Sequence, residues 1–154
     1  MERSLEDVCK AAEARRLPRW EELPDLELYM DQVLALTERY LGAGQITASM
    51  VNNYVKLGVV PPPVKKRYSR AHLARLLEVC ALKASLPIES IGRLPREPEE
   101  AAFYNRFCEA YEEAFRSAAA AARQAAALPS VYAAALRSGA EQVVARALSE
   151  DKSE

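Results

Sequence analysis

Four hydrogen-bonding residues recur at helical spacing between Thr47 and Gly58, namely Ser49, Asn52, Asn53 and Lys56. Positions three and four residues apart lie on one face of an α-helix. Hydroxyl, amide and ammonium groups of this kind bind the base edges and phosphates of nucleic acids, and none of the four is acidic. The same pattern is also typical of a solvated helix face, and spacing alone does not separate the two interpretations.

The helix that would carry this face is predicted over residues 47–57. Thr47 is a favourable N-cap, and Gly58 is a favourable stop. The opposite face is apolar, with Met50, Val51, Tyr54 and Leu57. Such an amphipathic helix packs its apolar face on a core and leaves its polar face accessible.

A stiff segment and a basic turn follow this helix. Three successive prolines, residues 61–63, cannot continue a helix and favour an extended chain. The turn after them contains Lys65, Lys66 and Arg67, and Tyr68 can anchor it against the core while the cations stay in water. These three cations are candidate phosphate contacts, with Arg70 and Arg75 as additional ones.

Two further helices are predicted to support the turn. Ser69 begins one as its N-cap, and its apolar positions include Leu73, Leu76, Leu77 and Cys80. Asp25 is predicted to cap a helix that continues to Leu41, before Gly42 and Gly44 end it. Its apolar face would contain Leu26, Tyr29, Met30, Val33, Leu34, Leu36 or Thr37, and Tyr40.

The order of these motifs resembles the DNA-binding head of the MerR family. The shared features are the Thr-capped helix, the stretch "KLGVV", the proline loop, the basic turn ending in "YS", the Leu-rich helix and "LPIESIGRL". More closely, "LPRWEELPDLELYMDQV", "ITASMVNNYVKLGVV" and "KKRYSRAHLARLL" resemble a bacterial domain-of-unknown-function family, number 1836, described as MerR-like. The resemblance extends from Leu17 to Leu94. It implies a winged helix-turn-helix in which the helix 47–57 enters the major groove and the wing 64–68 contacts phosphates.

At some positions this sequence differs from the usual MerR pattern. Asn52, Asn53 and Tyr54 fall where MerR proteins usually have Arg-Tyr-Tyr, and Lys56 falls where they have Arg. Lys66 to Tyr68 fall where MerR proteins have Arg-x-Tyr. An asparagine at position 52 binds phosphate more weakly than arginine would, or reads adenine through two hydrogen bonds.

The charge distribution agrees with a localised site for a polyanion. The whole chain has a net charge of -1 and a pI near 6.0. Residues 46–96 contain nine Lys or Arg and two Glu, a net charge of +7, whereas the rest contains 12 basic and 20 acidic residues, a net charge of -8. Local clustering, and not the total charge, sets the potential that steers a partner.

Outside the head, the sequence predicts further helices. A helix over residues 4–15 begins at Ser4 with a capping-box pattern, and a long helix over residues 97–128 is followed by one over residues 130–148. We expect four parts: an N-terminal helix (1–16), the head (17–96), a C-terminal helical hairpin that could dimerise the chain (97–149) and a frayed tail (150–154). Phe107, Tyr111 and Phe115 form part of an aromatic stripe that is either core or a dimer or partner surface.

Several classes of function find no support. The single histidine, His72, is interpreted as a surface residue in the first turn of a helix, and no Gly-rich phosphate loop or paired-carboxylate motif is present. We therefore expect no enzyme, cofactor or metal site. Cys9, Cys80 and Cys108 are predicted to be buried thiols. No apolar run approaches membrane-spanning length, so we expect a cytoplasmic protein with no membrane contact.

The sequence thus predicts an all-α protein, or nearly so, with at most a small β wing. Two hypotheses for function remain. The first is a sequence-specific, homodimeric DNA-binding protein that regulates transcription, with no effector identified. The second is a non-enzymatic adaptor that holds another protein on a winged-helix scaffold.

Overall fold

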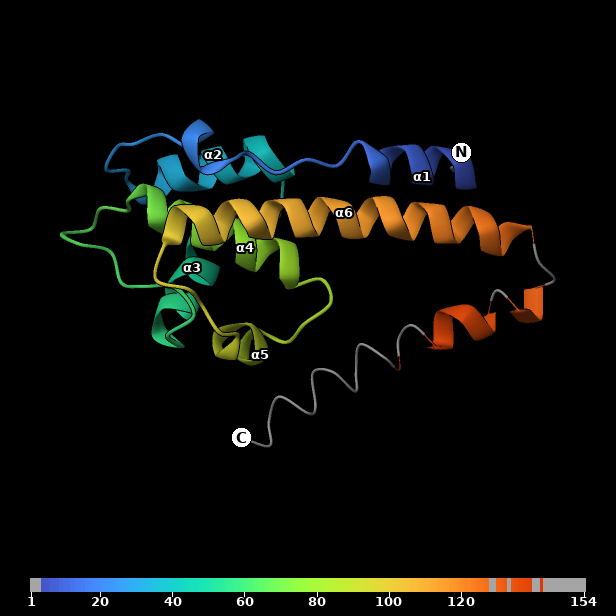
Figure 1. The fold of residues 1–154 in the computed structure, drawn as a ribbon. Coiled ribbons are helices and arrows are strands. Elements are labelled where there is room, and N and C mark those ends of the chain that lie inside the picture. The colour runs from blue at the N-terminus through green and yellow to red at the C-terminus, as the bar shows by residue number, and fades with distance from the viewer. Residues whose placement is uncertain (1–3, 128–129, 133, 140–141, 143–154) are drawn as a thin grey trace. The chain divides into compact units, whose positions relative to one another are not determined.

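The computed structural model describes residues 4–127, 130–132, 134–139 and 142. The named helices are α1 (Leu5–Glu13), the 3-10 helix η1 (Trp20–Glu22), α2 (Met30–Leu41), α3 (Ala48–Lys56), α4 (Arg70–Leu82), α5 (Ile88–Arg93) and α6 (Glu100–Ala126) (Figure 1). Among the described residues, the only β-type pairings are two isolated bridges, Leu28 with Tyr68 and Val64 with Arg67. The prediction of a helical protein is confirmed.

The chain divides into two compact units. Unit 2 is residues 16–111, and unit 1 is residues 1–15 together with 112–154. The boundary at Tyr111 lies inside α6, beyond the one expected near residue 96. The reason is that the first part of α6 contributes Tyr104 and Cys108, both fully buried, to the core of unit 2.

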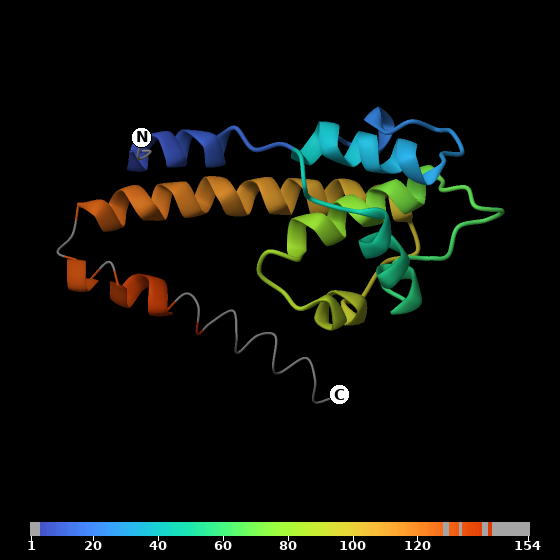
Figure 2. The ribbon, with the colours of Figure 1, turned by 180° about the vertical axis from the view of Figure 1, so that it is seen from behind.

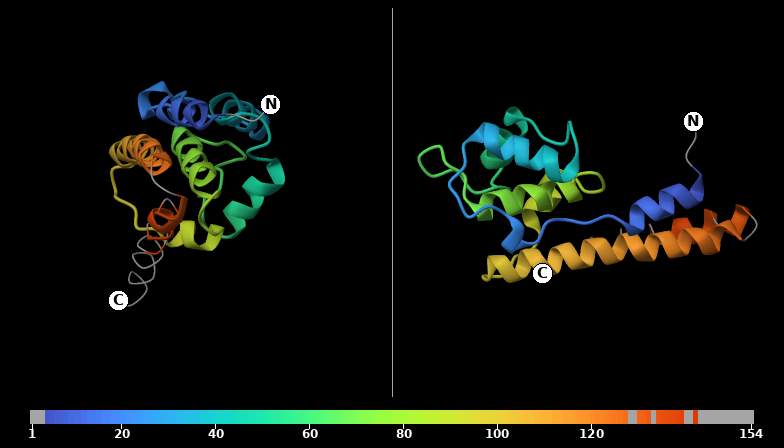
Figure 3. Two further views of the ribbon diagram at one scale, coloured as in Figure 1. Left: turned by 90° about the vertical axis from the view of Figure 1, so that its right-hand side faces the viewer. Right: turned by 90° about the horizontal axis from the view of Figure 1, so that it is seen from above.

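Helix α4 is the centre of unit 2. All its residues from His72 to Cys80 are buried, and in the left view of Figure 3 the helices α2, α3 and α5 lie around it. Leu73, Leu76 and Leu77 are completely inaccessible to solvent. A helix buried on every side has no amphipathic pattern. The alanine and leucine content of α4 provides this apolar surface, and its two buried charged residues, Arg75 and Glu78, form an ion pair with each other.

Helix α2 begins later than the sequence predicts. Its first residue is Met30, with Tyr29 as N-cap, so the prediction of a helix from Asp25 is wrong. The cause is tertiary, because Leu28 donates its N–H to the Tyr68 carbonyl and accepts from the Tyr68 N–H, both at 2.8 Å. This pairing keeps the chain extended before α2. As a result Leu26 and Tyr29, which were predicted on the apolar face, are exposed.

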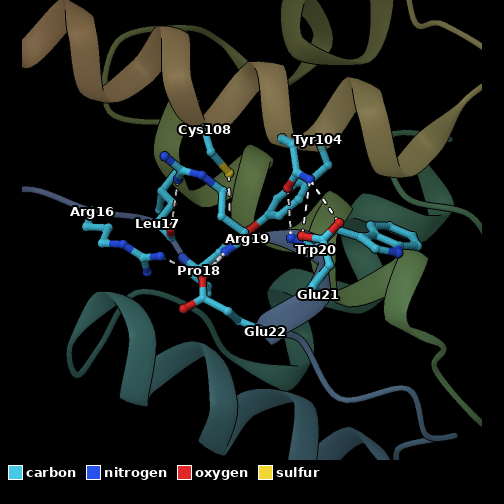
Figure 4. Close-up of polar contacts among 10 residues, drawn as sticks. Arg16, Leu17, Pro18, Arg19, Trp20, Glu21, Glu22, Tyr104 and Cys108 are labelled. Carbon is cyan, nitrogen blue, oxygen red and sulfur yellow. Dashed lines mark hydrogen bonds and ion pairs between the residues drawn. The ribbon is translucent and has the colours of Figure 1, made fainter.

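The segment before η1 is fixed against the first part of α6 (Figure 4). The Tyr104 hydroxyl donates a 2.7 Å hydrogen bond to the Pro18 carbonyl. The Trp20 N–H donates to Asn105 Oδ1 at 2.8 Å, and the Trp20 ring lies 6.4 Å from that of Tyr104. Because these bonds connect residues far apart in sequence, they hold both ends of unit 2 together.

Unit 1 contains α1 and the second part of α6. Ser4 caps α1 with the predicted capping box, in which the Asp7 N–H donates to Ser4 Oγ at 3.1 Å. Arg123 pairs with the carboxylates of Glu6 and Glu13. These hydrogen bonds lower the pKa of both carboxyl groups.

The long helix is confirmed, with a start at Glu100 in place of residue 97. The predicted helix over residues 130–148 and the tail 150–154 lie largely outside the described residues, of which 130–132, 134–139 and 142 are helical. All three cysteines are buried free thiols, as predicted.

Candidate nucleic-acid interface

The polar face of α3 is fully accessible. Ser49, Asn52, Asn53 and Lys56 are all exposed, whereas Val51 and Tyr54 on the opposite face are buried. Thr47 Oγ1 accepts the Met50 N–H at 3.2 Å, and Gly58 ends the helix with a φ of 73°. Both end signals behave as predicted. Met50 and Leu57, however, were predicted on the packed face and are exposed, because they lie at the edge of the buried face that Val51 and Tyr54 define.

The four polar side chains of this face are available for binding. None of them has a hydrogen-bond or ion-pair partner among the residues that the structure describes. Together they offer amide donors and acceptors, a hydroxyl and an ammonium group. This set can bind both base edges and phosphate oxygens.

The basic turn is a two-residue hairpin. Val64 and Arg67 exchange backbone hydrogen bonds of 3.0 and 2.9 Å across it. Its two central residues, Lys65 and Lys66, have φ angles of 50° and 62°. Positive φ at both positions is the pattern of a type I′ turn, which normally favours Asn and Gly. Lysines therefore occupy positions where an ordinary L-residue is strained.

The turn projects from unit 2 at the end where α3 lies, as Figures 1 and 2 both show. Both lysine side chains at its tip are exposed. We call Ser49, Asn52, Asn53, Lys56, Lys65 and Lys66 the candidate interface. No Asp or Glu occurs between residues 46 and 77, so the segment that contains the candidate interface has no negative side chain of its own.

Buried contacts hold the base of the turn. Tyr68 is 4% exposed and pairs with Leu28, which confirms its predicted role as an anchor. Its ring meets that of His72 edge-on, with centroids 5.6 Å apart, and burial raises the pKa of the Tyr68 hydroxyl. The Arg67 guanidinium lies 4.0 Å from the centre of the half-exposed Tyr29 ring, which limits the freedom of Arg67 to reach a phosphate.

His72 is a structural residue and not the surface residue that the sequence predicts. It is 8% exposed, and its Nδ1 lies 3.0 Å from the Ser69 N–H and its Nε2 lies 3.0 Å from the Pro62 carbonyl oxygen. A backbone N–H only donates and a carbonyl only accepts, so the neutral ring with its proton on Nε2 satisfies both contacts. His72 thereby connects the proline segment to the start of α4.

Two of the predicted phosphate contacts are engaged elsewhere. Arg75 is 6% exposed and donates to the Val59 carbonyl at 2.8 Å and to Glu78 Oε2 at 2.9 Å. Burial lowers the pKa of Arg75, while the bond to Glu78 opposes that effect. Its prediction as a DNA contact is wrong, because it is a core residue. Arg70 lies 3.6 Å from Asp25 and 5.6 Å from the Trp20 ring, and its side chain is 21% exposed.

The aromatic residues of α6 that were predicted as core or as a partner surface, Phe107, Tyr111 and Phe115, are all partly buried. Phe107 and Tyr111 stack at 5.8 Å and pack against the core of unit 2. In unit 1, Phe115 is half-buried beneath the Arg15 guanidinium, 4.3 Å from the ring centre. For Phe107 and Tyr111, the interpretation as core residues is the one that these contacts favour.

Unit 2 also contains a buried charge cluster that the sequence did not predict. Glu78 Oε2 accepts from Arg75 and also from Arg96, at 2.5 Å, and Glu78 is only 2% exposed. Arg75 and Glu78 are three residues apart on one predicted helix, and this spacing could have indicated their ion pair. The contact of Arg96 with Glu78 could not be predicted from the sequence, because only the tertiary fold brings the two residues together.

The described residues contain no group of three or more metal-binding side chains. Within the same described ranges, no helix has the length and apolar character needed to span a bilayer.

These features define a helical protein whose unit 2 presents an acid-free polar surface on one helix and one turn. The chain belongs to the family described as Domain of unknown function (DUF1836), which matches residues 18–114. The matched segment nearly coincides with unit 2 and includes the whole candidate interface. Comparisons with curated proteins and with solved structures found no match.

Proposed function

We propose that this protein is a sequence-specific DNA-binding protein that regulates transcription. The observation that carries the proposal is the candidate interface, which combines unpartnered amide groups on α3 with lysines at a projecting turn. Helices α2 and α3 would act as a helix-turn-helix of MerR-like type, and the turn 64–67 as a reduced wing. The link between the two helices, residues 42–47, is longer than the three or four residues of a tight helix-turn-helix.

The two parts of the interface would have different tasks. Asn52 and Asn53 can each form two hydrogen bonds with the major-groove edge of adenine. Lys65 and Lys66 would neutralise phosphates and thereby fix the register of α3 on the duplex. Affinity would then depend mainly on the lysines, and sequence preference on the asparagines.

The test is selection from a random-sequence duplex pool at two salt concentrations, followed by sequencing of the retained DNA. We expect an enriched motif and an affinity that falls with salt by a slope of roughly 0.9 per phosphate contacted. A palindromic motif would indicate that two copies of the chain bind together. Absence of retention even at low salt would refute the proposal.

A matched pair of charge reversals tests the assignment of the surface. Lys66→Glu changes the tip of the turn, whereas Lys10→Glu makes the same change on an exposed residue of α1 in unit 1. We expect Lys66→Glu to weaken binding and lower the salt slope, and Lys10→Glu to leave both nearly unchanged. Equal effects of the two substitutions would indicate nonspecific attraction to the whole protein.

A further inference from the structure

A cavity of about 260 Å³ lies within unit 2, away from the polar face of α3. The end of α3, the segment 59–62, α4 and Gly92 of α5 form its walls, together with Arg96 and Glu100. Binding cavities for drug-sized molecules have about 300–1,000 Å³, so this one suits a smaller ligand. Pro61 and Pro62 stiffen one wall, which favours a site that exists before the ligand binds.

One side of the cavity carries an excess of positive charge. Arg75 and Arg96 line it, and both donate to the same oxygen of Glu78, so two cations share a single buried carboxylate. Each nitrogen of Arg75 already donates one hydrogen bond, to Glu78, to the Val59 carbonyl or, at 3.4 Å, to the Ile91 carbonyl. The three side chains of this cluster therefore have a net formal charge of +1, and Glu100 elsewhere in the lining has the opposite charge.

Arg96 has the free donors. Only its Nη1 donates to a protein acceptor among the described residues, which leaves Nε and Nη2 available. The Phe103 ring lies 4.7 Å from the guanidinium carbon, and the Arg96 side chain is 32% exposed. The ring and Glu78 together orient the guanidinium plane. Two parallel N–H groups of a fixed guanidinium match the two oxygens of a carboxylate.

The remaining wall selects an aliphatic ligand. Val55, Pro61 and Pro62 present methyl and methylene groups to the cavity, and the buried Val59 and Val60 lie behind them. A branched hydrocarbon of four or so carbons would contact these groups and displace water from them. The carboxyl end and the hydrocarbon end of such a ligand face different walls, which fixes its orientation.

We propose that this cavity binds a small aliphatic monocarboxylate, with its two oxygens on Nε and Nη2 of Arg96 and its hydrocarbon on the valine and proline wall. A monoanion matches the charge of the cluster, whereas a dianion would exceed it and would also be repelled by Glu100 in the lining. The site does not depend on the proposed DNA binding, and it is tested without DNA.

The first experiment titrates the full chain with 3-methylbutanoate by calorimetry and follows the thermal unfolding temperature in parallel. We expect saturable binding with one site per chain and a rise in the unfolding temperature with ligand concentration. The uncharged 3-methylbutanamide is the matched control and should bind about tenfold more weakly or worse. Equal binding of acid and amide, or no saturation by the acid, would overturn the proposal.

Three substitutions locate the site. Arg96→Lys keeps the charge and the contact with Glu78 but loses the planar pair of donors, so affinity should fall about tenfold. Gly92→Ala adds a Cβ that would lie 3.1 Å from Val59 Cγ2, which narrows the cavity and should also weaken binding. Glu100→Gln removes a negative charge from the cavity lining and should strengthen binding of the acid. Arg93→Lys, on the exposed side of α5, is the control and should have no effect.

Titration with leucine distinguishes a monocarboxylate site from a site for a zwitterionic amino acid. Its ammonium group would pair with Glu100, so a zwitterion site would bind leucine more tightly than 3-methylbutanoate and would be weakened by Glu100→Gln. That combination would overturn the monocarboxylate assignment.

Discussion

The turn of the candidate interface offers a test in which stability and binding should change in opposite directions. Lys65 and Lys66 both have positive φ angles, at which an L-residue with a Cβ costs about 1–2 kcal/mol relative to the right-handed region. Replacing them by the pair that a type I′ turn favours, as Lys65→Asn together with Lys66→Gly, relieves that strain. The same change removes both charges from the tip.

The expected gain in the free energy of unfolding is about 1 kcal/mol. Relief of strain at the two positions is partly offset by about 0.5–1 kcal/mol, because Gly is freer in the unfolded chain. For a chain of this length the unfolding temperature should rise by roughly 2–4 °C. In the same variant, loss of two phosphate contacts should reduce the slope of log affinity against log salt by roughly 2.

The assays are thermal or urea unfolding followed by circular dichroism, and DNA binding at several salt concentrations. The double substitution Lys65→Ala and Lys66→Ala is the control, because it removes both charges and keeps a Cβ at both positive-φ positions. We expect it to lose as much binding as the Asn–Gly variant without the gain in stability. An unchanged salt slope in both variants would refute the phosphate contacts, and a less stable Asn–Gly variant would refute the strain argument.

Three further predictions concern individual side chains. Asn53→Ala should cost about 1–3 kcal/mol of discrimination at one base pair and leave the salt slope unchanged, which repeating the duplex selection would measure. His72→Ala leaves the Ser69 N–H and the Pro62 carbonyl without their partner and should lower the free energy of urea unfolding by about 1–3 kcal/mol; an unchanged value would contradict the structural role of the ring. Burial raises the pKa of the Tyr104 hydroxyl, so its stabilisation is complete below the unfolded pKa of about 10 and is lost as the pH rises further. Urea unfolding above pH 10 should therefore show a smaller loss of stability for Tyr104→Phe than for the wild type.

The local sequence predicted those features that local interactions control. The caps at Ser4 and Thr47 bond to backbone N–H groups three residues away, and the glycine after α3 adopts a conformation that other residues avoid. The alternation of polar and buried residues along α3 likewise follows from helical geometry alone. For these features a short window of sequence contains every interacting group.

The structure differs from the sequence predictions where a residue far away in the sequence decides the local conformation. Leu28 is extended because it pairs with Tyr68, 40 positions later. The residue types at positions 25–29 do not predict that pairing. Arg75 and Arg70 belong to a basic cluster in the sequence, yet α4 turns the first into the core, and Asp25 and Trp20 engage the second. A count of charges cannot distinguish a cation that faces solvent from one that neutralises a buried carboxylate.

The sequence by itself therefore determined the helical class, the end signals of the helices and the presence of a polar, acid-free face on α3. Helical periodicity and capping are short-range, so they can be read directly from the order of residues. The tertiary structure alone decided which cations remain available, how the lysine turn is anchored, and where a cavity forms beside Arg96. These depend on packing between segments that are far apart in the chain, and their energies are set only when those segments meet.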